Sequence, residues 1–273
     1  MPSPIIPPRD WTAIPWPEVA QQDAARWIAV LPLAATEQHG PHLPLRTDVL
    51  IAEAYLVEVW QLLPAQLPAT FLPVEEIGIS TEHTDYPGTV TLSPAEALRN
   101  WLTIGDRVAR AGIRKLVMVS SHGGNSAAMS IVAQELRAKH GLLAVTTAWS
   151  RFGVPEGLFT AEELRHGVHG GAVETSIMLA RYPEQVQKGA IANFVPASIA
   201  MGKQYRRLST HRPAPLAWQA QDLHPSGAAG DATQASAEKG ERLLDHGARA
   251  FCELLEDVDR FDISALRSVP AKD

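Results

Sequence analysis

The chain has 273 residues, a formal net charge of −6 at pH 7 and 45% hydrophobic residues, the composition of an ordinary globular protein. No run of Lys or Arg stands out, which argues against a nucleic-acid backbone or an anionic membrane surface as the partner. We therefore expect a small-molecule partner and, because no linker is visible, one domain over residues 1–273.

The single cysteine and the N-terminal residues bear on the compartment. Cys252 lies in an apolar run, which excludes an intrachain disulfide and suits a reducing environment. Residues 1–8 lack the basic start and unbroken apolar core of a signal peptide, and no apolar run is long enough to cross a bilayer. The sequence therefore predicts a cytoplasmic protein.

The first part of the chain predicts two strands with a helix between them. Trp11 and Trp16 are expected to pack an N-terminal arm onto the core or onto a neighbouring subunit. Thr47 is expected to cap the first long helix, which Pro64 ends. The predicted elements here are strands at 27–33 and 71–79, a helix at 48–63 and a polar loop at 80–89.

The middle of the chain repeats the alternation of strand and helix. Ser93-Pro94-Ala95-Glu96 has the form of a capping box, and the helix that it opens runs to about Arg110. Asn125 or Ser126 caps the next helix, with Gly141 as its stop. Strands are predicted at 115–120 and 142–147. This alternation predicts a three-layer α/β/α sandwich with a mainly parallel sheet.

The last part of the chain is less regular. Residues 149–171 read as a polar loop, and residues 172–180 as a buried helix. Residues 184–229 show little periodicity and are expected to form irregular covering segments, as a lid or an oligomer contact. One or two helices are expected at 231–257.

Three carboxylates and two imidazoles stand out as candidate metal ligands: Glu37, His39, Asp48, His122 and Glu174. This donor set suits two divalent ions of the zinc, manganese or iron type better than a thiolate site. Glu37 and His122 each follow a predicted strand, so a parallel sheet would bring their loops together at its carboxyl edge. Two such ions would share a water, lower its pKa and polarise a substrate carbonyl.

Some of these residues have simpler explanations. Asp48 in the first turn of a helix is favoured by the helix dipole without any metal. The run His122-Gly123-Gly124-Asn125 is also compatible with an anion cradle at a helix N-terminus. Glu174 is the most telling, because a buried carboxylate without a partner is costly. Taken singly, the other histidines are expected to be surface or hydrogen-bonding residues: His42, His83, His140, His211 and His246.

Motifs along most of the chain carry a resemblance to a known family. They are Trp16-Pro17-Glu18-Val19, Thr36-Glu37-Gln38-His39-Gly40-Pro41-His42-Leu43-Pro44, Thr47-Asp48, Glu82-His83 with Pro87-Gly88-Thr89, His122-Gly123-Gly124-Asn125, His169-Gly170-Gly171 with Glu174-Thr175-Ser176, and Gly230-Asp231 with Glu238-Lys239-Gly240. Through them the chain resembles the creatininase family of metal-dependent amidohydrolases. The resemblance implies an α/β sandwich assembled as a homo-oligomer, often a hexamer.

The resemblance also implies roles for single residues. Glu37, Asp48 and His122 would hold one ion, and His39, Asp48 and Glu174 the other, with Asp48 bridging. His169 is similar to the family's catalytic histidine, which moves a proton between the bridging water and the departing nitrogen. Catalytic roles are thus expected for His169 and Glu174, and substrate contacts for Glu82, His83, Thr89 and Asn125.

Departures from the family pattern limit what can be expected of the substrate. Gly124 stands where creatininase itself has a carboxylate, which weakens creatinine as the substrate. Arg46 stands where glycine is common, and it is either solvated or meets an anionic substrate group. We expect hydrolysis of a C–N bond in a small cyclic amide or formamide by a metal-bridging hydroxide. The alternatives are a non-amide substrate such as an oxidised cyclitol, or a non-catalytic metal- or anion-binding protein.

Overall fold

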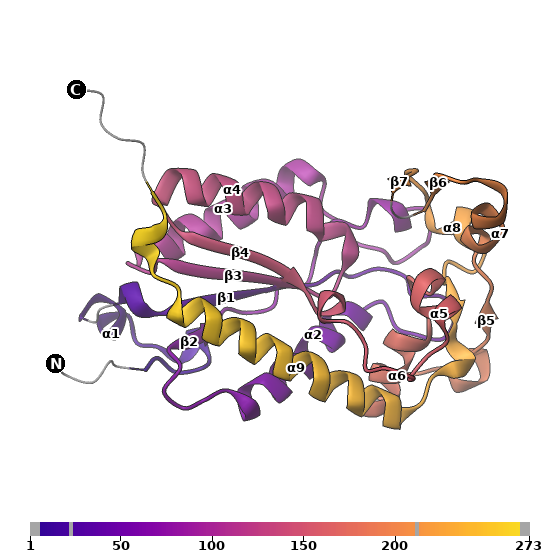
Figure 1. Ribbon diagram of the computed structural model, residues 1–273, viewed down its shortest axis with the longest axis horizontal. Coiled ribbons are helices and arrows are strands. Elements are labelled where there is room, and N and C mark those ends of the chain that lie inside the picture. Colours follow the sequence, from indigo (N-terminus) through magenta and orange to yellow (C-terminus); the bar gives the residue numbers. More distant parts are fainter. Residues whose placement is uncertain (1–5, 22–23, 211–212, 268–273) are drawn as a thin grey trace.

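A parallel sheet of four strands lies at the centre of the fold, in the order β2-β1-β3-β4 (Figure 1). The computed structural model describes residues 6–21, 24–210 and 213–267. The strands are β1 (Ile28–Leu33), β2 (Ala69–Phe71), β3 (Lys115–Ser120) and β4 (Leu143–Ala148). β1 and β3 pair along their whole length, up to Leu33 opposite Ser120, so both strands end at the same edge of the sheet.

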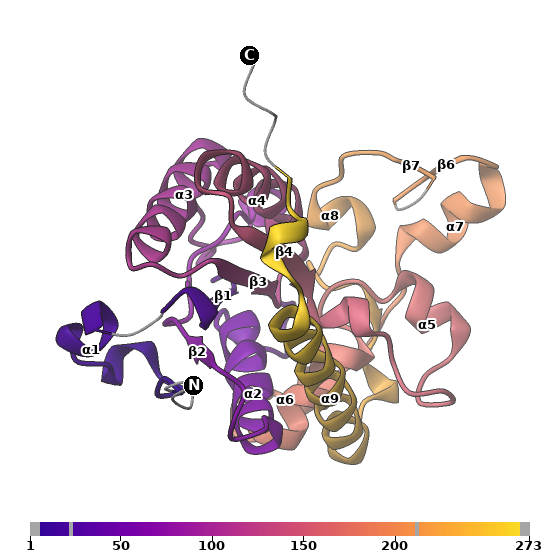
Figure 2. The ribbon, with the colours of Figure 1, turned by 60° about the vertical axis from the view of Figure 1, so that its left-hand side comes forward.

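Helices cover both faces of this sheet (Figure 2). The first face carries α2 (Thr47–Leu62), α6 (Ala172–Arg181) and α9 (Ala237–Arg260), and the second carries α3 (Pro94–Arg110) and α4 (Ser126–His140). Because successive strand residues point to opposite faces, β1 supplies Ile28 and Val30 to the first apolar cluster and Ala29 and Leu31 to the second. The predicted three-layer sandwich is confirmed.

The order of the strands places a crevice at one edge of the sheet. β1 leads through α2 to β2, whereas β3 leads through α4 to β4, in the opposite direction and over the opposite face. The strand order therefore reverses between the carboxyl ends of β1 and β3. In open α/β sheets this is where ligands bind.

Several local predictions are confirmed. The strands at β1 and β3 lie where the apolar runs placed them. Ser93 and Glu96 form the capping box of α3, since the Ser93 side chain accepts from the Glu96 N–H and the Glu96 carboxylate accepts from the Ser93 N–H. Gly141 ends α4 with a φ of 69°, in the left-handed region that favours glycine.

Other predictions were wrong in detail. The second strand was predicted at 71–79 but covers only Ala69–Phe71. Beyond it the chain meets β1 again at one isolated bridge, between Leu33 and Glu75. Thr47 is the first residue of α2 rather than its cap, and its hydroxyl donates to the Pro44 carbonyl. Asn125 makes no capping bond to α4, because its amide is bonded to other loops.

The last part of the chain holds more regular structure than expected. Residues predicted as a loop contain α5 (Ala161–His166), and one helix, α9, replaces the one or two expected. The region 184–229 contains β5 (Asn193–Phe194), α7 (Ala197–Gln204), β6 (Leu208–Ser209), β7 (Ala214–Pro215) and α8 (Ala220–Leu223), and β8 (Gly230–Asp231) follows. These elements gather with α5 beyond the carboxyl ends of the sheet strands (Figure 1).

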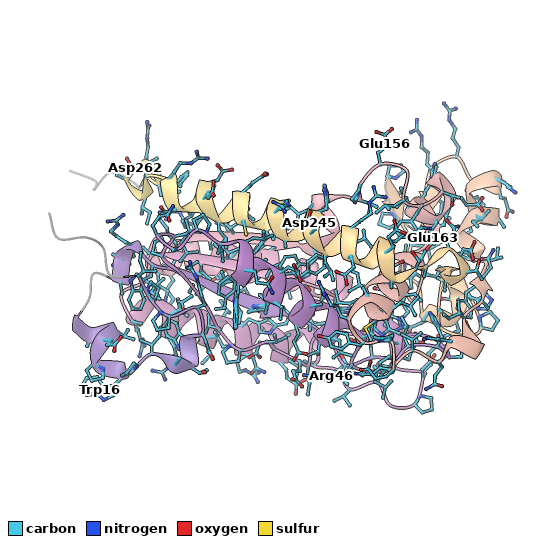
Figure 3. All side chains as sticks on the ribbon, turned by 90° about the horizontal axis from the view of Figure 1, so that it is seen from below. Trp16, Arg46, Glu156, Glu163, Asp245 and Asp262 are labelled. Atoms are coloured by element: carbon cyan, nitrogen blue, oxygen red, sulfur yellow. The ribbon has the colours of Figure 1, made fainter. Side chains whose placement is uncertain are left out.

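The surface residues singled out by the sequence lie away from that region or are paired. Trp16 in α1 (Trp16–Gln21) is 79% exposed, at the opposite end of the molecule from Glu163 (Figure 3). Arg46 forms ion pairs with Glu53 at 2.7 Å and Glu76 at 3.0 Å. His211 lies outside the described residues. Within the described ranges, no helix combines the length and apolar character needed to cross a membrane.

Candidate metal centre

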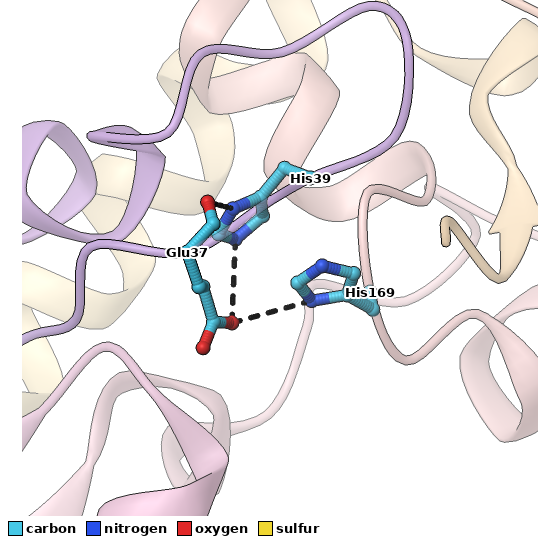
Figure 4. A group of neighbouring side chains, drawn as sticks. All are labelled: Glu37, His39 and His169. Carbon is cyan, nitrogen blue, oxygen red and sulfur yellow. Dashed lines mark hydrogen bonds and ion pairs between the residues drawn. The ribbon is translucent and has the colours of Figure 1, made fainter. Parts of the chain in front are cut away.

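Glu37 lies at the middle of the candidate centre, in the loop that follows β1. Its side chain is fully buried, and its Oε1 atom lies 3.2 Å from Nδ1 of His122, 3.4 Å from Nε2 of His83 and 3.6 Å from Nδ1 of His169. Figure 4 shows His39 and His169 next to each other, both facing the same oxygen of this carboxylate. Neither carboxylate oxygen of Glu37 has a hydrogen-bond partner among the described residues.

The histidines are oriented by hydrogen bonds to backbone carbonyls. His39 donates from Nδ1 to its neighbour Glu37 O at 3.1 Å, and His122 donates from Nε2 to Ile79 O at 2.7 Å. These bonds leave Nε2 of His39 and Nδ1 of His122 turned toward the carboxylates, as the nitrogens that could bind a metal ion. Metal-binding histidines are held in this way, by a hydrogen bond on the nitrogen that does not bind.

Two helix N-termini bring the remaining carboxylates. Asp48 lies in the first turn of α2, with Oδ1 3.6 Å from Nε2 of His39 and Oδ2 3.3 Å from Nδ1 of His122. Glu174 lies in the first turn of α6, where its Oε2 accepts from the Gly170 N–H at 2.5 Å. The dipoles of both helices favour negative charge at these positions.

The donor atoms form three groups, each with its atoms within 4.8 Å of one another: Glu37, Asp48 and His122; His39, Asp48 and Glu174; and Glu37, His39 and His169. The first two are the ligand sets that the family resemblance implied, and they share Asp48. The third group brings His169 to the same place.

Unpartnered atoms show that these residues fit metal ions. Oε1 and Oε2 of Glu37, Nε2 of His39 and Oδ2 of Asp48 are buried without a hydrogen-bond partner in the described part of the chain. Burying such atoms is costly unless a counter-charge satisfies them. Carboxylate and imidazole donors suit zinc, manganese or iron, so the donor set agrees with divalent cations.

The charges around the centre shift the pKa values of its groups in opposite directions. Burial alone would lower the pKa of His39, but Asp48, Glu174 and Glu37 raise it to about 9. Burial raises the pKa of Glu174 to about 7, and the nearby Asp48 and Glu37 charges act in the same direction. Divalent cations must displace protons from such groups, so we expect metal loading to release protons.

His169 occupies a different environment from the other histidines. Its Nε2 donates to the Gln38 carbonyl at 2.5 Å, and its ring stacks between His39 at 4.2 Å and His83 at 4.1 Å. Burial, followed by the two stacked imidazoles, lowers the pKa of His169 well below its ordinary value. The ring is therefore neutral at pH 7, with Nδ1 available as an acceptor.

Gln38 was not singled out by the sequence, although it lies between two candidate ligands. Its Nε2 atom donates to Nδ1 of His83 at 2.7 Å and to the Gly227 carbonyl at 3.0 Å. It also lies 3.2 Å from Nε2 of His169. Gln38 thus connects the loop after β1 to two histidines and to the segment before β8. Its position in the run between Glu37 and His39 was the available signal.

The residues predicted to contact substrate lie around the same loops. Glu82 places Oε1 3.7 Å from Nε2 of His122. Thr89 accepts from the Gln38 N–H at 3.1 Å. Asn125 is fully buried, and its amide accepts from the Ile79 N–H and donates to the Ala34 carbonyl. These contacts brace the loops, and the substrate contacts themselves stay predictions.

Gly124 leaves no space for a side chain. A Cβ atom here would lie 2.3 Å from Ile79 O and 2.5 Å from Nε2 of His122. At Gly123, by contrast, nothing lies within 4 Å of an added Cβ atom.

Glu163 is a positioning residue that the sequence did not reveal. It is 4% exposed, its Oε1 accepts from the Ala172 N–H at 2.7 Å and its Oε2 accepts from the Asp231 N–H at 2.6 Å. The carboxylate thereby joins the start of α6, which carries Glu174, to β8. The sequence did contain a sign of the helix that carries Glu163, because Thr160 and Glu163 have the spacing of an N-cap pair. In the structure the Thr160 hydroxyl accepts from the Glu163 N–H.

Comparison with known proteins shows which family the chain is similar to. A family model described as "Creatininase: Creatinine amidohydrolase" matches residues 12–255. The chain is 33% identical over 252 residues to mycofactocin precursor peptide peptidase of Mycobacterium ulcerans (strain Agy99), covering 87% of this chain and 86% of that protein. It is 28% identical over 259 residues to creatinine amidohydrolase of Pseudomonas putida, covering 89% and 94%. A solved structure titled "Creatininase Mn" has the same fold, with a TM-score of 0.74, 24% identity and coverage of 92% and 98%.

Proposed function

The chain belongs to the creatininase family, and from this premise we propose that it hydrolyses an amide C–N bond at a centre of two divalent metal ions. The observation that carries the proposal is the set of buried, unpartnered carboxylate and imidazole atoms where the strand order reverses. The sequence alone favoured a cyclic amide or formamide. The name of the relative from Mycobacterium ulcerans adds a peptide bond to the candidates.

We assign the ligands as two sets that share one carboxylate. Glu37, Asp48 and His122 would hold one ion, and His39, Asp48 and Glu174 would hold the other. Zinc, manganese and iron all suit these donors. Divalent ions at such sites lower the pKa of water toward neutrality and polarise a carbonyl oxygen.

His169 is the residue that we assign to proton transfer. Its ring is held by the bond from Nε2 to Gln38 O and is neutral, so Nδ1 can accept the proton of the attacking water and return it to the departing nitrogen. Glu174 is assigned a catalytic role as well as a ligand role. The Gly170 N–H orients its carboxylate, and the Gly170 and His169 backbones belong to the same loop.

Metal content and turnover, measured together on variants, test this assignment. We expect Glu174→Gln and His122→Ala to lose metal and activity while staying folded, and His169→Ala to keep its metal with a severe loss of turnover. His140→Ala is the control, since His140 pairs with Asp106 on the other side of the sheet. Two tightly bound ions per chain in both ligand variants would contradict the ligand assignment. Full activity in His169→Ala would remove it from the mechanism.

Chelation and remetallation separate the proposal from its rivals. The parent protein, assayed with lactams, formamides, short peptides and cyclic ketones, should lose activity with a chelator and regain it with zinc or manganese. A purely structural metal predicts closed coordination and no turnover under any metal. An anion cradle at His122 to Asn125 predicts binding of inorganic phosphate that survives chelation.

A further inference from the structure

A cavity of about 510 Å³ lies beside Glu174, at the end of the candidate metal centre. Its walls come from the segments after β3 and β4 and from α2, α5 and α6. They are mainly apolar, with Trp149, Val154 and Ile177 among the residues that line it. A substrate held here would place an apolar part in the cavity and its scissile bond toward Glu174.

Arg165, in the last turn of α5, supplies the only Lys or Arg side chain among the lining residues of this cavity. Within the described part of the chain it makes no ion pair and no side-chain hydrogen bond, whereas Arg46 and Arg181 each contact two carboxylates. The nearby Glu163 carboxylate is already bonded to two backbone N–H groups. Arg165 is exposed, so its guanidinium is solvated and is free to bind a carboxylate of a ligand.

Trp149 adds a second unused donor to the same walls. It is 4% exposed and stacks on Tyr55 with ring centroids 4.3 Å apart, and its Nε1 atom has no hydrogen-bond partner in the described residues. A buried indole N–H normally has a partner. The cavity thus combines apolar walls with an unpaired guanidinium and an unpaired N–H, and Glu174 is its only lining carboxylate.

We propose that Arg165 selects substrates that carry a carboxylate, joined to the scissile amide by an apolar part that fills this cavity. The inference rests on the proposed amide hydrolysis and narrows its substrate class to acidic amides, including peptides with a free carboxylate. A guanidinium binds a carboxylate through two parallel N–H···O bonds, and this geometry gives both affinity and orientation.

Matched pairs of substrates test the proposal with the metal-loaded protein. Lactams and short peptides are assayed as free acids and as the corresponding carboxamides, which differ only in charge. For Arg165→Gln we expect kcat/KM for the acids to fall roughly 10- to 100-fold, mainly through KM, with little change for the carboxamides. Arg165→Lys should retain part of the preference. Arg151→Gln is the matched control, because Arg151 is exposed like Arg165 but does not line the cavity.

A binding measurement keeps this test independent of turnover. The probes are 3-phenylpropionate and 3-phenylpropanamide, titrated into the parent, Arg165→Gln and Arg151→Gln proteins. Tighter binding of the acid that disappears only in Arg165→Gln supports the proposal even if no amide is hydrolysed, in which case the proposed function alone fails. Amide hydrolysis with equal rates for acids and carboxamides, or an equal loss of both in Arg165→Gln, overturns the Arg165 proposal and leaves the proposed function standing.

Discussion

Replacing Gly124 with alanine should lower both the stability and the metal content of this protein, whereas the same change at Gly123 should alter neither. The Gly124 Cβ atom would lie 2.3 Å from Ile79 O and 2.5 Å from Nε2 of His122. These two atoms are joined by the 2.7 Å hydrogen bond that turns Nδ1 of His122 toward Glu37 and Asp48. The alanine can be accommodated only if that bond breaks or the backbone moves.

The size of the effect follows from these contacts. Overpacking of a dense interior costs about 1–3 kcal/mol, and a lost hydrogen bond to a buried group costs about 1–3 kcal/mol, so we expect a loss of about 2–6 kcal/mol. At about 2–4 °C per kcal/mol for a chain of this size, that corresponds to a fall in Tm of roughly 4–24 °C. At Gly123 the added Cβ atom has nothing within 4 Å, so the Tm should stay within about 2 °C of the parent.

Two measurements check this prediction. Calorimetry on the metal-loaded proteins gives the change in Tm, and elemental analysis after dialysis against a weak chelator gives the metal content per chain. We expect Gly124→Ala to retain less metal than Gly123→Ala, because His122 is no longer oriented. A Gly124→Ala protein with the parent's Tm and metal content would refute this account of the loop.

Three further changes test other contacts. Gly240→Ala should lower the Tm, because its Cβ atom would lie 2.1 Å from the Ser176 carbonyl oxygen of α6. Gly202→Ala should leave the Tm unchanged or raise it, because nothing lies within 4 Å of the added Cβ atom. A lower Tm in Gly202→Ala than in Gly240→Ala would contradict this packing argument. Glu163→Gln should reduce kcat while metal is retained, since an amide cannot accept from both the Ala172 and Asp231 N–H groups; an unchanged kcat would remove Glu163 as a positioning residue. Chelation should lower the Tm by several degrees, because a metal ion present at about 1,000 times its Kd stabilises the folded protein by about 4 kcal/mol. The same Tm with and without the chelator would count against bound metal.

The sheet could be predicted from sequence because its strands are short apolar runs bounded by clear turn signals. β1 and β3 lie where expected, and the α3 capping box and the Gly141 stop act locally, within a few residues. β2 was misplaced, because only three of its residues pair with β1 and the predicted strand was drawn across Pro73, which cannot donate a hydrogen bond to the sheet. The role of α5 could not be predicted, because Glu163 acts through the Ala172 and Asp231 N–H groups, which are distant from it in sequence.

The convergence of the candidate ligands was predictable for a topological reason. Residues after parallel strands meet at one edge, so Glu37 and His122 come together whatever the details of their loops. The stacking of His169 between His39 and His83 was not visible in the sequence, because it depends on where the loop before α6 folds back. Ligand roles, location and assembly as a homo-oligomer stay predictions.

The two candidate ligand sets differ in how much of the chain they require. Glu37, Asp48 and His122 lie on the segment that forms β1, α2 and β3, so this set draws only on the first half of the chain. The set with His39 also requires Glu174, and therefore requires α6 to be packed in place. If the proposed ligand assignment holds, the two sets therefore depend on different parts of the fold, and a chain shortened before α6 would lack the second set alone.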